Sequence, residues 1–112
     1  MSLNKAEMFA FAASLGMPAD MMGDVGEILQ EELPKLRQSM QALYEARDYD
    51  GLFKCAHSYK GSVASVTNGE LWQAVQALEL LARHQHSWAE IDAAWAKIPP
   101  LHDEMLAVLA TF

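Results

Sequence analysis

The spacing of apolar residues is helical along nearly the whole chain. One segment, from residue 20 or 24 to about 46, places them at alternating steps of four and three residues. These positions are Leu29, Leu33, Leu36, Met40 and Leu43. Such spacing is typical of a helix that packs one face against a bundle core. No run of β-branched residues alternates with polar ones, so no strand is predicted.

Residues that start and stop helices divide this pattern. Asn4 with Glu7 predicts a capping box for a short first helix, and Leu3 with Met8 predicts a hydrophobic staple over it. The helix is expected to end near residues 16–18, Gly-Met-Pro. Glycine favours the position just after a helix, and proline favours the positions beyond it.

Three more helices have predicted caps. These are Asp48 for a helix over about 49–66, Thr67 with Glu70 for one over about 68–84, and Ser87 with Glu90 for one over about 88–110. Proline must bend or interrupt the second helix at Pro34 and the fifth at Pro99-Pro100. The connections are short, which forces neighbouring helices to run antiparallel. We therefore predict an all-α fold, an up-down antiparallel four-helix bundle with an additional short N-terminal helix.

Composition limits the size and the partners of the protein. The 112 residues are expected to form a single domain, 1–112, because 52% apolar content is ample for one core. Eight basic and fifteen acidic residues give a net charge of −7. This charge argues against nucleic acid or an anionic membrane as the main partner. No membrane span, no secretory signal and a lone Cys55 together predict a cytoplasmic protein.

The helix over about 49–66 carries the candidate chemistry. On a wheel of about 100° per residue, its apolar side is formed by Leu52, Cys55, Tyr59, Val63 and Val66. His57 falls on the opposite side and is expected to face solvent. The residues within about 60° of it are Phe53, Lys54, Lys60, Gly61 and Ala64. The histidine thus lies beside two lysines and two residues with little or no side chain.

These neighbours suit a histidine that carries a phosphoryl group. A neutral imidazole nitrogen is nucleophilic near pH 7, since the unperturbed pKa of histidine is ~6.5. Lys60, one turn further on, disfavours the imidazolium and can hold phosphoryl oxygens. Gly61 inside a helix costs ~1 kcal/mol relative to alanine, so its presence needs a reason. Its missing side chain, with Ala64 a turn later, leaves room for a phosphoryl group and a partner.

Residues 56–62, Ala-His-Ser-Tyr-Lys-Gly-Ser, resemble the signature of histidine-containing phosphotransfer (HPt) domains. The resemblance covers about residues 25–84. It includes similar residues at Asp48, Leu52, Leu71 and Leu78-Glu79. Thr67 stands where the family often has a glycine, with Gly69 two residues later, and Tyr59 stands where a leucine is usual. A core can accommodate Tyr59 if its hydroxyl finds a partner.

The resemblance implies a function. His57 would accept a phosphoryl group from the aspartate of a receiver domain and pass it to another receiver, with Lys60 and Gly61 in the roles given above. The wheel and the resemblance together give the supporting residues Ser62, Glu79, Lys54 and Ala64. In HPt domains an apolar patch beside the histidine meets the receiver. Its candidates here are Phe53, Met8, Phe9 and Phe11.

Such a carrier is expected to need no cofactor of its own. The sequence has no glycine-rich nucleotide loop and no acidic Mg²⁺ cluster near the motif, so we expect neither ATP use nor turnover alone. Mg²⁺ is expected on the partner, a receiver domain of a response regulator or a hybrid histidine kinase.

Two other functions remain open at this point. The chain could be a non-catalytic interaction module that binds and inhibits a receiver or histidine kinase, in which case His57 is dispensable. It could also be a metal- or ligand-binding bundle, although no Glu-x-x-His pair lies on the core seams and His84-Gln85-His86 lacks a third ligand nearby. We predict no metal site, and His102, without a companion, at the surface. A monomer is expected, although the apolar first helix could pair two copies.

Overall fold

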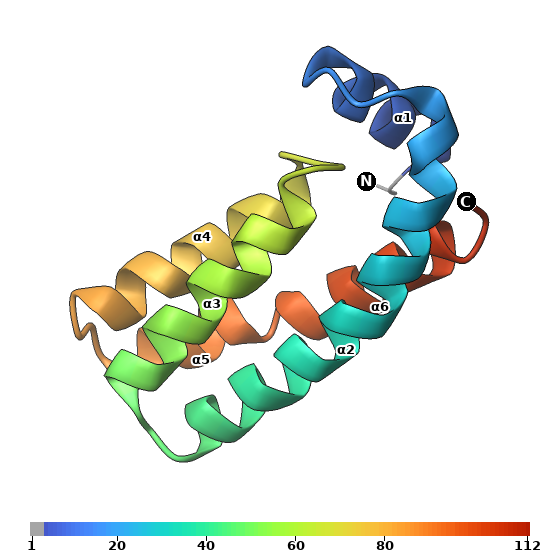
Figure 1. The fold of residues 1–112 in the computed structure, drawn as a ribbon. Coiled ribbons are helices and arrows are strands. Elements are labelled where there is room, and N and C mark those ends of the chain that lie inside the picture. The colour runs from blue at the N-terminus through green and yellow to red at the C-terminus, as the bar shows by residue number, and fades with distance from the viewer. Residues whose placement is uncertain (1–3) are drawn as a thin grey trace.

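The described part of the chain, residues 4–112 of a computed structural model, is helical throughout (Figure 1). Its elements are α1 (Lys5–Ser14), a short 3-10 helix η1 (Ala19–Met21), α2 (Met22–Glu45), α3 (Tyr49–Val63), α4 (Glu70–Arg83), α5 (Trp88–Trp95) and α6 (Ile98–Leu109). Since no strand occurs among residues 4–112, the predicted all-α class is confirmed.

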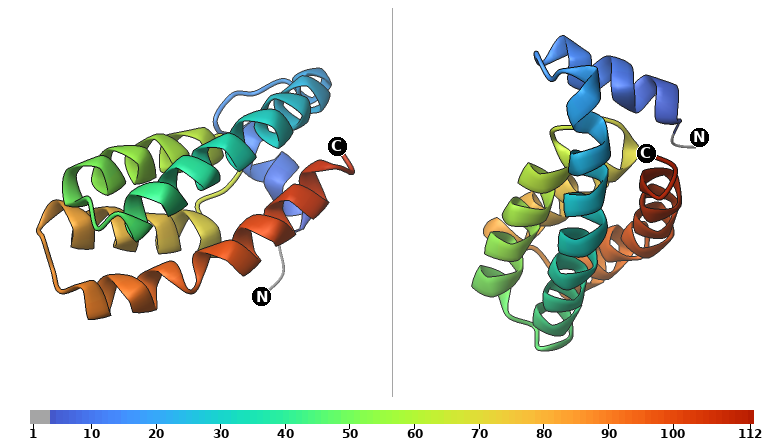
Figure 2. Two further views of the ribbon diagram at one scale, coloured as in Figure 1. Left: turned by 90° about the horizontal axis from the view of Figure 1, so that it is seen from below. Right: turned by 45° about the vertical axis from the view of Figure 1, so that its right-hand side comes forward.

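Four rods form the bundle. Helices α2, α3 and α4 alternate in direction, and α5 and α6 together form the fourth rod (Figure 2). Helix α1 lies across the end at which α2 begins and α6 ends, where the Lys5 ammonium donates a 2.6 Å hydrogen bond to the Thr111 carbonyl. The bundle measures 43 × 22 × 22 Å. Within residues 4–112, no helix combines the length and the apolarity that crossing a membrane requires.

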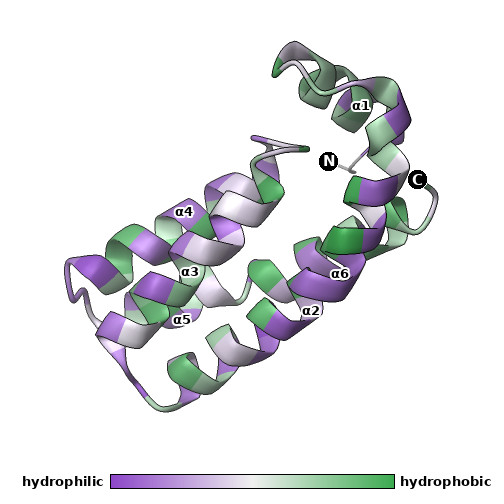
Figure 3. Cartoon of the chain, in the orientation of Figure 1, coloured by the Kyte–Doolittle hydropathy of each residue, from purple (hydrophilic) through white to green (hydrophobic). Residues whose placement is uncertain are grey.

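The core lies where the four rods meet. Every α-helix contributes buried apolar residues to this core, and hydrophobic and hydrophilic residues alternate along the rods (Figure 3). The predicted stripes over residues 20–46 and 49–66 are part of this core; their buried members are Leu29, Leu33, Met40, Leu52, Tyr59, Val63 and Val66. Cys55 is half-buried, and the three tryptophans pack against the core from its edge.

Three of the predicted helix starts are confirmed. The Asn4 side chain accepts hydrogen bonds from the first turn of α1, and the Asp48 side chain accepts one from the first turn of α3. The Ser87 hydroxyl accepts the backbone N–H of Glu90 at the start of α5. The staple partner Leu3 lies outside the described residues.

The predicted capping box of α4 is wrong. Helix α4 begins at Glu70, and its N-cap is Gly69, which has no side chain to cap it. The Thr67 hydroxyl instead accepts the backbone N–H of Gly69 at 2.9 Å, and Thr67 is buried. The hydroxyl therefore closes the turn before the helix, because Thr67 lies two residues before the N-cap position.

The prolines act differently in the two predicted helices. Helix α2 continues through Pro34 without a break. The predicted fifth helix is divided in two, since α5 ends at Trp95 and α6 starts at Ile98. Pro99 and Pro100 fall in the first turn of α6, where a missing N–H costs nothing.

His102 is buried, which corrects the expectation that it lies at the surface. Only 2% of the residue is exposed, and its Nδ1 lies 2.7 Å from the Tyr59 hydroxyl. Tyr59 is itself fully buried. Tyr59, which stands where a leucine is usual in HPt domains, therefore has a partner for its hydroxyl in His102 of α6.

Candidate functional site

His57 lies near the middle of α3 and faces solvent, as the helical wheel predicts. Its side chain is 67% exposed, whereas its neighbours Ala56 and Tyr59 are fully buried. The buried residues fix the rotation of α3 about its axis. The imidazole is therefore presented to solvent by a rigid helix.

A buried carboxylate orients the imidazole. Oε2 of Glu79, on α4, lies 3.0 Å from Nδ1 of His57, and the Glu79 side chain is only 6% exposed. An ionised carboxylate can only accept, so we assign the hydrogen between these atoms to Nδ1. In the neutral ring, Nε2 then carries the free lone pair.

Lys60 is the third member of this group. Its ammonium lies 2.8 Å from Oε1 of Glu79 and 5.5 Å from the centre of the Trp72 ring, and its side chain is 19% exposed. Burial raises the pKa of Glu79, but hydrogen bonds and charge from Lys60 and His57 outweigh burial and bring the pKa below its ordinary value. Glu79 is therefore a carboxylate at neutral pH.

The geometry changes the part expected of Lys60. The sequence predicts that its ammonium holds phosphoryl oxygens directly, whereas in the structure it is paired with Glu79. Glu79 thus lies between Lys60 and His57 and contacts both. Direct contact with a phosphoryl group stays a prediction.

Gly61 leaves open space beside the histidine. A Cβ placed on Gly61 would meet nothing within 4 Å, whereas one on Gly51 would lie 2.6 Å from a Leu43 methyl group and one on Gly26 would lie 2.8 Å from Phe112. Close helix packing therefore explains Gly26 and Gly51 but not Gly61. Space at the surface is the remaining reason for this glycine.

The other predicted supporting residues have partners elsewhere. The Ser62 hydroxyl donates a 2.9 Å hydrogen bond to Glu32 of α2. Lys54 pairs with Asp50 of its own helix at 2.9 Å. Ala64 caps the C-terminal end of α3. Of the four supporting residues, only Glu79 hydrogen-bonds to the histidine.

The structure separates the predicted docking residues. Phe53 is half-buried one turn before His57, and the Arg83 guanidinium lies 5.6 Å from its ring centre. Met8 is wrong as a docking residue, because it is 2% exposed and belongs to the core. Phe9 packs edge-on against Phe112 at the end of the bundle, with ring centres 4.9 Å apart. Docking by Phe9 and by the half-buried Phe11 stays a prediction.

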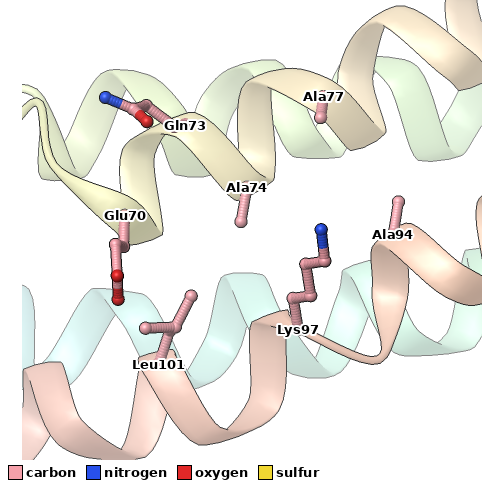
Figure 4. Close-up of a pocket in the computed structure, with 7 residues that line it drawn as sticks. All are labelled: Glu70, Gln73, Ala74, Ala77, Ala94, Lys97 and Leu101. Carbon is pink, nitrogen blue, oxygen red and sulfur yellow. The ribbon is translucent and has the colours of Figure 1, made fainter. Parts of the chain in front are cut away.

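A groove of about 520 Å³ runs along the opposite side of α4, between α4 and the α5–α6 rod (Figure 4). Its lining residues are Glu70, Gln73, Ala74, Ala77, Ala94, Lys97 and Leu101. None of these residues belongs to the histidine site. Among residues 4–112, no three histidine, cysteine or acidic side chains gather as metal ligands would.

Residues 24–111 match a family model, that of the Hpt domain. The chain belongs to the Hpt domain family. The match runs from the first turn of α2 to beyond the end of α6, further than the resemblance over 25–84 indicates. No curated protein and no solved structure matches the chain. Membership places the protein in two-component signalling, in which Hpt domains transfer phosphoryl groups on histidine and interact with receiver domains and kinases.

Arg83 is a neighbour of this group that the sequence pattern does not single out, and its guanidinium lies 5.6 Å from the centre of the Phe53 ring. It follows Glu79 by four residues, so both side chains leave the same face of α4. That spacing is the signal in the sequence, but it is informative only once Glu79 is known to contact His57.

Proposed function

We propose that this Hpt domain is a phosphorelay intermediate that carries a phosphoryl group on Nε2 of His57. It takes the group from the phosphoaspartate of one receiver domain and gives it to the aspartate of another. The observation that carries the proposal is the contact between Nδ1 and the buried Glu79. This contact leaves Nε2 as the nucleophile on a ring that is 67% exposed.

The transfer step needs little from the Hpt domain besides a nucleophile in position. The Nε2 lone pair attacks phosphorus as the bond from phosphorus to the aspartate oxygen breaks, and the electron pair leaves with the aspartate carboxylate. Nδ1 keeps its hydrogen, so the phosphorylated ring carries a positive charge. Because Glu79 is already ionised and fixed, it stabilises that charge without rearranging. Transfer to the second receiver reverses the step.

The pair of Glu79 with Lys60 keeps the reverse step accessible. A carboxylate alone would stabilise the charged ring strongly, whereas the ammonium 2.8 Å from Oε1 offsets part of this effect. A carrier must release its phosphoryl group as readily as it accepts it. A charge-balanced support under the histidine suits that requirement.

His57→Gln tests the site, and His86→Gln is a matched control. His86 is also exposed and also hydrogen-bonds to a carboxylate through Nδ1, to Glu90 at 3.0 Å, but it has neither a buried carboxylate nor a lysine beneath it. We expect a phosphorylated receiver to label the wild type and His86→Gln but not His57→Gln. Labelled His57→Gln protein would contradict the assignment.

Two further measurements separate the relay from the interaction module. Mass spectrometry under alkaline conditions is expected to find an acid-labile phosphohistidine at residue 57. The relay also requires label to leave again, to a second receiver. A protein that binds a receiver with unchanged affinity after His57→Gln and never carries label would be the non-catalytic module.

A further inference from the structure

Most of the basic side chains have a partner in the structure, and a few do not. Five of them pair with carboxylate oxygens at 2.8–3.4 Å, namely Lys35, Arg37, Arg47, Lys54 and Lys60. The Lys5 ammonium donates to the Thr111 carbonyl. Between residues 4 and 112, only Arg83 and Lys97 have neither an ion pair nor a hydrogen bond. These two side chains keep all their hydrogen-bond donors available in a chain whose net charge is −7.

Arg83 lies on the face of the histidine. Helices α3 and α4 run antiparallel, and Glu79 of α4 meets His57 of α3. One turn further along α4, Arg83 lies over Phe53, which is one turn before His57 on α3. Measured along the helix axes, the Arg83 guanidinium is therefore displaced from His57 by about one helical turn, or ~5 Å.

Phe53 holds the guanidinium in place without using its hydrogen bonds. A cation over an aromatic face is attracted by the ring, and the contact leaves the five N–H groups of arginine free. The Arg83 side chain is exposed, so these donors face solvent. A planar, pre-positioned guanidinium is suited to bind a carboxylate through two parallel hydrogen bonds.

The proposed function supplies a partner of the right chemistry. A receiver that presents a phosphoaspartate must also present carboxylates that hold Mg²⁺, so the rim of its pocket is acidic. A carrier with a charge of −7 repels such a surface overall. We propose that Arg83 is a docking residue that pairs with a carboxylate at the rim of the receiver's pocket, with Phe53 as the apolar contact beside it. This inference rests on the proposed relay function.

Lys97 provides a matched control. Among residues 4–112, Lys97 is the other basic side chain with neither an ion pair nor a hydrogen bond, but it lies in the groove between α4 and α6 (Figure 4). The groove residue Ala77 is about 160° around α4 from Glu79, so this surface faces away from the histidine. Replacing Arg83 or Lys97 by the same residue changes the net charge by the same amount, so the two sets of variants differ in where the charge is changed.

The test measures transfer from a phosphorylated receiver to Arg83→Gln, Arg83→Glu, Lys97→Gln and Lys97→Glu at several salt concentrations. We expect Arg83→Glu to lower the second-order rate constant about tenfold at low salt, with a smaller loss for Arg83→Gln. The loss should shrink as salt rises, and the maximal rate at saturating receiver should change less than about twofold. Arg83→Lys should recover part of the rate, and both Lys97 variants should match the wild type.

Three outcomes would overturn the inference. The first is a second-order rate constant of Arg83→Glu equal to that of the wild type, and the second is a loss in Lys97→Glu as large as that in Arg83→Glu. The third is an altered lifetime of phosphohistidine in the isolated Arg83 variants, with the salt dependence of transfer unchanged. The last result would mean that Arg83 acts on the phosphoryl group and not on the partner. Failure of the relay function itself looks different, because the wild type would then carry no label on His57. Thermal melting of each variant checks that the fold is retained.

Discussion

At the scale of single residues, Glu79 is the residue whose loss should be most informative. Glu79→Ala removes the acceptor at Nδ1 and leaves the Lys60 ammonium without its partner, so we expect transfer to fall at least about tenfold. Glu79→Gln keeps an acceptor but loses the charge, so a smaller loss is expected. Long-range ¹H–¹⁵N NMR correlation should show the Nδ1–H tautomer of His57 in the wild type and a mixture in Glu79→Ala. An unchanged tautomer would remove the positioning role.

Gly61 and Gly51 make a second pair of contrasting residues, both inside α3. Gly61→Ala should raise stability by about 1 kcal/mol, because the new methyl group meets nothing and alanine favours the helix. Gly51→Ala should destabilise the protein, since its Cβ would lie 2.6 Å from atoms of both Leu43 and Asp48. Urea denaturation measures both changes. Loss of stability in Gly61→Ala would mean that the space beside His57 is not open.

A bulkier residue at the same position tests the use of that space. Gly61→Leu should leave the bundle folded but slow transfer from a receiver, because the side chain would occupy the surface beside the imidazole. Circular dichroism and the labelling assay measure the two effects separately. Wild-type transfer rates in a folded Gly61→Leu protein would leave the glycine without a functional explanation.

Spacing along one helix explains which of these residues the sequence could predict. His57, Lys60 and Gly61 share a helix, so a wheel places them on one side without any knowledge of the fold. The contact of Glu79 with His57 depends on the register of α4 against α3, which periodicity does not determine. Only the resemblance indicated Glu79. Arg83 over Phe53 depends on the same register, so it became visible only in the structure.

At the scale of elements, caps were predictable where the side chain lies directly before the helix. Asp48 and Ser87 each bond to the first turn that follows them. Thr67 satisfies the same sequence rule, but Gly69 intervenes as the N-cap, and the hydroxyl bonds to Gly69 instead. The capping-box rule depends on residue types alone. It therefore cannot distinguish an N-cap residue from a residue in the turn that precedes the N-cap.

The Asp48 cap should contribute measurably to the helix that carries the site. Asp48→Ala removes the acceptor for the Gly51 N–H at 3.0 Å and should cost about 1 kcal/mol of stability. Thr67→Ala breaks a turn and not a cap, so hydrogen exchange should show faster opening of the α3–α4 connection but not of the first turn of α4. Equal fraying of that first turn would restore the capping role of Thr67.

At the scale of the whole molecule, the bundle was predictable but its polar interior was not. Short connections and apolar stripes predict four antiparallel rods, and this prediction does not depend on which side chains meet between them. The Tyr59–His102 pair joins α3 to α6 across the core, between residues 43 positions apart. Nothing local marks His102 as buried, because its companion comes from another rod. A lone histidine in a sequence therefore says little about its exposure.

This buried pair should make the stability of the whole bundle depend on pH. Burial lowers the pKa of His102, and the nearby Arg37 guanidinium lowers it further, while Asp103 offsets part of the effect. The unfolded chain therefore binds a proton at His102 more readily than the folded chain. Above the unfolded pKa of about 6.5 neither state is protonated there, and the full stability is present. As pH falls below that value, stability is lost, with a slope of at most about 1.4 kcal/mol per pH unit for this one group.

His102→Asn separates this effect from other titrations. The asparagine carbonyl can still accept the Tyr59 hydroxyl but does not titrate, so the variant should be less stable at pH 7 yet show a flatter dependence of stability between pH 7 and pH 5. Tyr59→Phe leaves the Nδ1 of His102 without its hydrogen-bond partner and should cost about 1–3 kcal/mol at pH 7. Urea denaturation across this pH range measures all three proteins. If the wild type and His102→Asn lose stability in parallel on acidification, the buried imidazole is not the group that couples protons to folding.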